Sequence, residues 1–232
     1  MKPLILALLS FTVIAAEIVI FEDDFSRDES QEKTEEIGKG WGSNSMKRAK
    51  GNKQVDLRDG AMHIYIHEAA DHAVSVTHKA EFENGVVELR FKLEDSKDKL
   101  GLNFADLRYK QVHAGHLFKV TVGTESIQVA DLKTGVMAKA IREAKLAKTL
   151  SAEQKAMLKT KTTSKENALE TGKWYALRVV VKGTRLSTSI DGKPVLSFSS
   201  PGIAHSTKRM LRLSVPRQAV VDDLKISALV DE

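Results

Sequence analysis

The chain has 232 residues, 29% of them charged, with a formal net charge of +5 and no cysteine. The absence of cysteine excludes disulfides, so a hydrophobic core must provide the stability, and the length suffices for one sizeable domain. The net charge is modest, and together with the export signal described next it leads us to expect no nucleic-acid partner.

The first sixteen residues predict an export signal. Lys2 supplies a positive charge, an apolar run covers residues 4–14, and the small pair Ala15-Ala16 follows. The run is shorter than a membrane span and no later segment approaches that length, although an uncleaved anchor is the alternative. We therefore expect a secreted or periplasmic protein whose mature part, residues 17–232, has no stable membrane insertion.

Two charged blocks follow the first apolar segment of the mature chain. Residues 22–36 are rich in aspartate and glutamate, whereas residues 39–58 are rich in lysine and arginine. A basic block of this kind suits a polyanion or a membrane surface, but such blocks are more often solvated loops. The sequence leaves both alternatives open.

Alternation of apolar and polar residues predicts strands along most of the mature chain. The clearest example begins at Trp174, where a strand ends at Gly183, a second strand follows, and the pair Asp191-Gly192 turns the chain into a third. The other expected strands, each bounded by turn residues, cover residues 18–25, 61–67, 74–78, 86–93, 100–109, 116–122, 126–130, 210–215 and 219–227. Many short alternating strands predict an all-β fold, an antiparallel β-sandwich or barrel.

One segment, residues 134–170, has helical spacing instead. Apolar residues recur every three or four positions over residues 137–147, and Ser151 with Gln154 three residues later predicts a capping box at the start of a second helix, residues 152–159. The segment is rich in lysine, so its outer surface should be solvated. We expect a helical insertion that covers one sheet edge, with partner binding as the alternative.

Several segments together resemble a known superfamily. They are the opening 22–27, Trp41, residues 55–62, residues 84–93, the hairpin 174–195 and the closing 220–226. They resemble the concanavalin A-like (laminin-G-like) jelly rolls, and among these the secreted bacterial proteins related to the 3-keto-disaccharide hydrolase domain, which is often described as glycoside hydrolase family 16-like. The resemblance covers nearly all of the mature chain except 134–170. It implies a single jelly-roll β-sandwich domain over residues 17–232.

The resemblance also implies a glycoside hydrolase, but the Glu-x-Asp-x-x-Glu arrangement that supplies nucleophile and acid in family 16 glycosidases is absent. A retaining glycosidase needs two carboxyl groups close together on one surface. Glu81 and Glu83 sit beside a turn, while Glu88 and Glu94 lie three strand repeats apart, so no pair is compelling. Whether the protein is an enzyme therefore stays open.

Polar side chains on the predicted strands form the candidate ligand site. The strand 61–67 places His63, Tyr65 and His67 on the face opposite its apolar residues. Further candidates lie on or after later strands, namely Asn103, Arg108, Tyr109, His113 and His116. An aromatic ring flanked by imidazole, amide and guanidinium donors suits a sugar. The alternative is that these are ordinary outward-facing residues, since half of any exposed sheet is polar.

Two arrangements suggest metal ions. His113 and His116 have a spacing at which two imidazoles can share an ion, but the sequence assigns no third ligand. In the strand 220–226, period two places Asp222 on the apolar face, and Asp24 of the neighbouring first strand is expected nearby, which would make an oxygen site for structural calcium. The alternative is that Asp222 accepts backbone hydrogen bonds or pairs with a cation. No cofactor other than calcium is expected.

We therefore expect an exported, non-catalytic jelly-roll module that recognises a glycan or a small saccharide. One alternative is a glycoside hydrolase of the 3-keto-disaccharide hydrolase type, and another is an envelope-associated scaffold protein that binds through the basic insertion. Trp41 and Trp174 could be sugar platforms, but each adjoins a strand and is expected to pack in the core. The sequence identifies neither the sugar nor the oligomeric state.

Overall fold

The computed structural model describes residues 16–230. The predicted export signal, residues 1–16, lies outside the described residues except for Ala16, which begins the first strand. Between residues 16 and 230, no helix has the length and apolar character that spanning a membrane requires. The secreted or periplasmic location stays a prediction.

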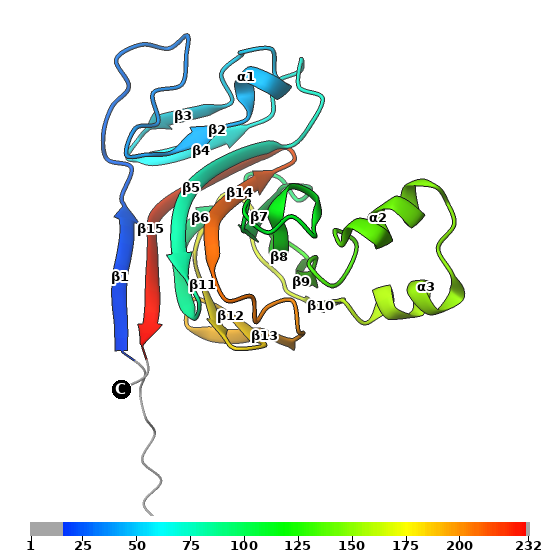
Figure 1. Ribbon diagram of the computed structural model, residues 1–232. Helices are drawn as coiled ribbons and strands as arrows, with labels where there is room; N and C mark the ends of the chain where they lie inside the picture. The colour runs from blue at the N-terminus through cyan, green and yellow to red at the C-terminus, as the bar shows by residue number, and fades with distance from the viewer. Residues whose placement is uncertain (1–15, 231–232) are drawn as a thin grey trace, which may run out of the picture.

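Two antiparallel sheets form a sandwich, as the sequence predicts (Figure 1). Sheet A consists, in spatial order, of β13 (Lys193–Ser199), β12 (Arg185–Ile190), β11 (Trp174–Lys182), β6 (Gly85–Lys92), β15 (Gln218–Val230), β4 (Ala61–Tyr65) and β3 (Val55–Arg58), and β1 (Ala16–Asp23) pairs with the second half of β15. Sheet B consists of β10 (Thr162–Glu166), β9 (Ser126–Asp131), β8 (His116–Gly123), β7 (Lys99–Ala105), β14 (Lys208–Val215), β5 (Val74–Phe82) and β2 (Gly42–Ser43). A short helix, α1 (Ser45–Arg48), follows β2. The all-β jelly-roll class is confirmed.

The core lies between the sheets because each strand turns its apolar residues inward. In β6, Leu89 and Phe91 are almost fully buried, whereas Arg90 between them is exposed on the opposite face. Across the core, Phe104 of β7 stacks on Phe118 of β8 with ring centroids 4.6 Å apart. Burying each of these rings stabilises the fold by about 1.5–3 kcal/mol. The polar side chains of the two sheets are consequently left on two outer faces, on opposite sides of the sandwich.

A bulge in β15 overturns the predicted orientation of Asp222. Asp222 pairs with Arg90 across the ladder, and the register shifts before the next pair, at Lys225, with Asp223 in the left-handed region at φ 46°. The extra residue turns Leu224 inward, where it is 1% exposed. Asp222 stays on the outer face, and Arg90 Nη1 donates to it over 3.2 Å. Counting in twos fails here because a bulge adds one residue to the strand.

The insertion at 134–170 contains helices α2 (Lys139–Leu146) and α3 (Ala152–Lys159), followed by the edge strand β10. The predicted capping box is confirmed: Ser151 Oγ accepts from the Gln154 N–H over 3.1 Å, and the Ser151 N–H donates to Gln154 Oε1 over 2.9 Å. Neither helix has a buried residue, and Figure 1 shows both projecting to one side of the sandwich. The expectation that they cover a sheet edge is therefore wrong, and β10, which helical spacing concealed, forms that edge.

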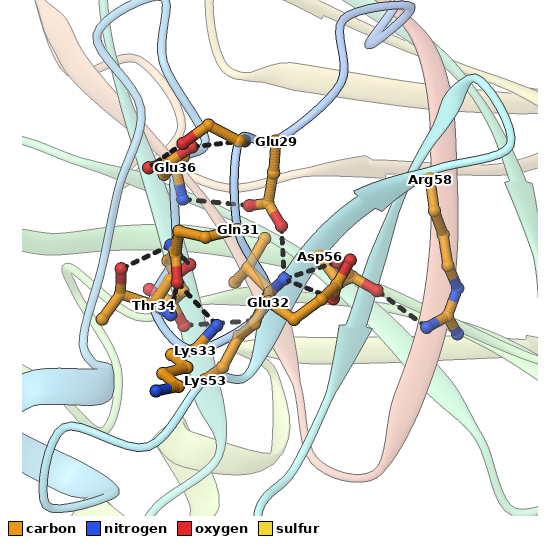
Figure 2. Close-up of polar contacts among 12 residues, drawn as sticks. Glu29, Gln31, Glu32, Lys33, Thr34, Glu36, Lys53, Asp56 and Arg58 are labelled. Atoms are coloured by element: carbon orange, nitrogen blue, oxygen red, sulfur yellow. Dashed lines mark hydrogen bonds and ion pairs between the residues drawn. The ribbon is translucent and has the colours of Figure 1, made fainter.

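Ion pairs join the acidic block to Lys53 of the basic block. Lys53, whose side chain is 8% exposed, lies between Glu29 and Asp56 (Figure 2). Lys53 Nζ pairs with Glu29 and is 2.7 Å from Asp56 Oδ1, and Arg58 Nη1 is 2.7 Å from Asp56 Oδ2. Burial alone would lower the pKa of Lys53, but hydrogen bonds to Asp56 and Glu29 raise it above its ordinary value. These ion pairs tie the loop before β2 to β3 and engage Lys53 and Arg58 of the basic block.

A second buried carboxylate fastens the other end of the same loop. Asp23, the last residue of β1, accepts hydrogen bonds from Arg27 Nη1 over 2.7 Å and from Lys39 Nζ over 3.0 Å. Trp41 Nε1 donates to Asp23 Oδ2 over 2.9 Å, and the Trp41 side chain packs in the core as predicted, with 8% exposure. The loop is consequently a structural clasp that joins the edges of both sheets.

Candidate functional site

The outer face of sheet B carries two rows of mostly polar residues that cross the strands. Lys119, Asn103 and Arg212 are direct neighbours in the middle of the first row, on β8, β7 and β14. Adjacent strands lie about 4.8 Å apart, so these three side chains span about 10 Å. The first row consists of Thr162, Ala130, Lys119, Asn103, Arg212, Thr77 and Gly42. The second consists of Ser164, Gln128, Thr121, Gly101, Ser214 and Ser75. We call the two rows, with His116, the platform.

His116 begins β8 and lies against the middle of the first row. Its Nδ1 is 3.0 Å from Asn103 Oδ1. Arg212 Nη1 is 3.2 Å from Nδ1 and 3.5 Å from Nε2, which places this guanidinium nitrogen over the face of the imidazole ring. Arg212 Nη2 also donates to the carbonyl oxygen of Ala114 over 2.8 Å, in the 3₁₀ turn before β8. In this arrangement Nδ1–H donates to Asn103, and Nε2 is left as a hydrogen-bond acceptor.

Burial shifts the ionisable groups of the platform towards their neutral forms. Burial, reinforced by the charge of Arg212, lowers the pKa of His116 to about 4, so its imidazole is uncharged at pH 7. Burial and the neighbouring Lys99 lower the pKa of Lys119, and burial lowers the pKa of Arg212. Perturbed groups that converge on one surface are typical of a functional site.

A glycine determines where the Lys119 side chain lies. A Cβ atom on Gly101 would be 2.5 Å from Lys119 Cε and 3.1 Å from Lys119 Nζ. The ammonium group therefore extends across the bare backbone of β7 towards the second row. Within the described range, Lys119 Nζ makes no hydrogen bond or ion pair, so it can donate to a ligand.

The platform combines hydrogen-bond donors and acceptors without negative charge. Its two rows contain hydroxyl, amide, guanidinium and ammonium groups, and none of their residues is aspartate or glutamate. Such a set can bind hydroxyl groups, carbonyl oxygens and anions. It does not contain the pair of carboxyl groups that a conventional glycosidase requires.

The structure brings together three of the residues predicted from the sequence. Asn103 and His116 contact each other, and His113 lies beside them, with the two imidazole centroids 6.4 Å apart. Lys119 and Arg212, at the centre of the platform, were not predicted. Alternation in the sequence could have identified Arg212, because it lies between two buried apolar residues of β14 just as Asn103 does in β7.

Arg108 and Tyr109 lie apart from the platform, in the loop that follows β7. Arg108 is exposed, and its backbone N–H donates to Asp106 Oδ1 over 2.8 Å. Tyr109 packs edge-on against His205, with centroids 4.9 Å apart, and His205 Nε2 is in turn 3.0 Å from Asp106 Oδ2. Arg108 and Tyr109 therefore take part in contacts that hold this loop, through Asp106 and His205.

The remaining predicted residues lie on the opposite side of the sandwich. His63 and Tyr65 are on the outer face of sheet A, where burial, with the charge of Arg58, lowers the pKa of His63, and burial raises the pKa of Tyr65. His67 follows the end of β4, and its Nδ1 accepts from the backbone N–H of Ala69 over 3.1 Å. A cavity of about 230 Å³ is lined by Arg58, His63, Ile64, Tyr65, Glu94, Gln218, Ala219 and Val220. The single cluster expected from the sequence is thus two separate groups.

A larger cavity, of about 580 Å³, also lies on the outer face of sheet A. Its charged groups bind one another: Glu88 accepts from Arg178 and pairs with Lys225 Nζ at 2.9 Å. Trp174 is on the same face, half-buried, with Arg90 Cζ 4.9 Å from its ring centroid. Its predicted place in the core is wrong, because Trp174 pairs with Lys92, an outward residue of β6. The paired charges leave this cavity fewer free donors than the platform.

Among the described residues, the structure completes neither predicted metal site with a third histidine, cysteine, aspartate or glutamate. In residues 16–230, no three histidine, cysteine, aspartate or glutamate side chains come close enough together to hold a metal ion. Burial and the charges of Asp223 and Asp24 raise the pKa of Asp222, so these carboxylates lie near one another on the outer face. Calcium binding by Asp24 and Asp222, and an ion shared by His113 and His116, stay predictions.

Several solved structures have the same fold as this chain. The carbohydrate-binding module CBM66 from Bacillus subtilis is 12% identical, covers 83% of this chain and 94% of its own, and has a TM-score of 0.53. The laminarinase from Rhodothermus marinus is 11% identical, with 94% and 99% covered and a TM-score of 0.61. Porphyranase B from Zobellia galactanivorans is 11% identical, with 93% and 94% covered and a TM-score of 0.59. At these identities the likeness shows the fold alone, an antiparallel jelly-roll sandwich.

A match to a family model identifies the family of the chain. Residues 33–220 match the model of the 3-keto-alpha-glucoside-1,2-lyase-like domain, and the chain belongs to this family. The resemblance recognised in the sequence is therefore confirmed. A comparison with curated proteins finds no match.

Proposed function

We propose that the platform is a saccharide-binding surface. The observation that supports this best is the contact of Asn103, His116 and Arg212. These three polar side chains are buried or half-buried and lie side by side on the outer face of sheet B. A saccharide presents hydroxyl groups that both donate and accept hydrogen bonds, and few convergent polar groups suffice to orient it. The uncharged His116 accepts at Nε2, while Lys119 and Arg212 donate.

The proposal is tested by isothermal titration of neutral oligosaccharides, with trehalose, sucrose, laminaritetraose and cellotetraose as probes. Asn103→Ala removes the partner of His116 and should weaken binding about tenfold, since a hydrogen bond contributes roughly 1 kcal/mol. Arg212→Met removes charged donors and should weaken it by about 10- to 100-fold. His63→Ala, on sheet A, is the matched control and should leave the dissociation constant unchanged.

Two outcomes would contradict the platform. If none of the probes binds the wild-type protein at millimolar concentration, the saccharide-binding surface is refuted for neutral sugars. If His63→Ala abolishes binding while Asn103→Ala does not, the site lies in the sheet A cavity.

A second candidate function is elimination from a 3-keto-glycoside, favoured by the family match and by the absence of platform carboxylates. A ketone at C3 acidifies the C2–H bond. His116 Nε2 takes the C2 proton, the released electron pair forms a C1=C2 double bond, and the C1–O bond breaks as the leaving alcohol takes a proton from water. Arg212 and Lys119 stabilise the charge that develops on the C3 oxygen.

The chromogenic substrate 4-nitrophenyl 3-keto-α-glucopyranoside distinguishes the two functions. A lyase releases nitrophenol, and His116→Gln lowers kcat far more than KM because it removes the proton acceptor. Binding without release, in the wild-type protein, excludes the lyase and leaves a non-catalytic module.

A further inference from the structure

The positive charge of this protein is concentrated in one projecting segment. Residues 134–165, which contain α2 and α3, have eight lysine and arginine residues against two glutamates, a formal charge of +6, whereas the whole chain carries +5. The rest of the chain is therefore close to neutral. Across the described range, none of these lysines and arginines forms an ion pair or a side-chain hydrogen bond, so their charge is uncompensated.

This segment adjoins the platform. The backbone N–H of His113 donates to the carbonyl oxygen of Met137 over 2.8 Å, and that of Lys139 donates to Gln111 over 3.0 Å. The charge of Arg142 contributes, after burial, to the lowered pKa of His113. The base of the hairpin is thus bonded to the turn that holds His116 and Arg212, and α2 begins at the rim of the platform (Figure 1).

The platform itself suits a ligand that carries negative charge. Lys119 and Arg212 stand at its centre, and neither row contains a carboxylate that would repel an anion. A cationic segment bonded to a cationic sugar-binding surface favours one extended ligand that reaches both. The complementary ligand is a polymer whose sugar units carry carboxylate or sulfate groups.

The shape of the hairpin favours such a polymer over a membrane surface. Helices that lie in a membrane interface need a broad apolar face. Here each helix has eight residues, and the large apolar side chain exposed on them is Leu146, at 67%. The exposed surface is otherwise dominated by lysine and alanine, which gives electrostatic attraction with little apolar area to bury.

We infer that the α2–α3 hairpin is a cationic arm that binds an acidic polysaccharide along its length while neighbouring sugar units of the same chain occupy the platform. This inference rests on the proposed saccharide binding and names the substrate class of the same site. It assigns the insertion a role in affinity and leaves the recognition of each sugar unit to the platform.

The test compares two charge-matched variants of the full chain. The arm variant is Lys145→Gln, Lys148→Gln and Lys155→Gln. The control variant, Lys33→Gln, Lys97→Gln and Lys193→Gln, removes the same charge from exposed lysines elsewhere. The probes are polygalacturonate and its methyl ester, which share a backbone and differ in charge, each titrated between about 50 and 200 mM salt, where screening changes.

We expect the wild-type and control proteins to bind polygalacturonate more tightly than its methyl ester, with strong salt dependence. The arm variant should lose most of this preference, and the slope of log affinity against log salt should fall by up to about one for each lysine removed. Neutral-oligosaccharide binding should be unchanged in the arm variant and weakened in Asn103→Ala, so failure of the arm and failure of the platform are distinguishable.

Three results would overturn the inference. The first is equal affinity of the wild-type protein for polygalacturonate and its methyl ester. The second is an equal loss in the arm and control variants, which would reflect net charge alone. The third is tighter binding, through the arm lysines, to phosphatidylglycerol vesicles or a short DNA duplex than to polygalacturonate, which would identify a different class of partner.

Discussion

Replacing Lys53 with methionine tests the buried ion cluster that fastens the loop before β2. The Lys53, Glu29 and Asp56 side chains are 8%, 2% and 7% exposed, so all three charges lie away from water (Figure 2). Methionine preserves much of the volume but leaves two carboxylates without their shared cation. Breaking a buried ion pair from one side costs about 3–5 kcal/mol.

The sign of the pH dependence follows from the carboxylate. In the wild-type protein, burial alone would raise the pKa of Asp56, but hydrogen bonding to Lys53 lowers it below 3.8. A lowered folded-state pKa contributes stability that is present above the unfolded pKa and is lost as the pH falls through the folded value. Without Lys53, the burial that raises the pKa of Asp56 is opposed less strongly, so the pKa of Asp56 rises. The penalty of the variant should therefore be largest at pH 7 and shrink towards pH 4.5, where protonation removes the uncompensated charge.

The assay is urea unfolding followed by tryptophan fluorescence at both pH values. Lys33→Met is the matched control, because Lys33 is exposed on the same loop, and it should change the free energy of unfolding by less than about 0.5 kcal/mol. A loss below about 1 kcal/mol for Lys53→Met at pH 7, or an equal loss at both pH values, would refute the reasoning.

Three further substitutions probe the platform and the base of the hairpin. Gly101→Ala places a methyl group against the Lys119 side chain and should weaken oligosaccharide binding several-fold in titration while lowering the melting temperature by only a few degrees. In thermal melts the wild-type protein should lose stability between pH 6.5 and pH 4, because a lowered histidine pKa makes folding less favourable as the pH falls. His116→Gln should make this loss of stability smaller. Gly202→Ala places a Cβ atom 1.9 Å from Asp131 Oδ1, so denaturant melts should show a loss of more than about 2 kcal/mol, and an unchanged midpoint would contradict the contact.

Alternation predicted the sandwich well because it reports which face of a strand is buried. It assigned the inward faces of β6 and β11 correctly. It failed at Asp222, because a bulge adds a residue that no count in twos can detect.

Pairing between distant strands was the part that the sequence could not provide. His63 and Asn103 both alternate with apolar residues, but nothing local says that β4 and β7 belong to different sheets. Arg212 joins the platform because β14 lies beside β7, more than a hundred residues away in the chain. For the same reason the basic residues of block 39–58 looked free, whereas Lys53 is buried against Glu29.

The central claim, that sugar binds on the outer face of sheet B, is tested most directly by NMR titration of the ¹⁵N-labelled protein with the oligosaccharide that binds best. The account predicts that the amide signals that move belong to β7, β8 and β14, with Asn103, Lys119 and Arg212 among the largest shifts. Shifts confined to β4 and β11 around Tyr65 and Trp174, with the signals of the platform unmoved, would contradict it.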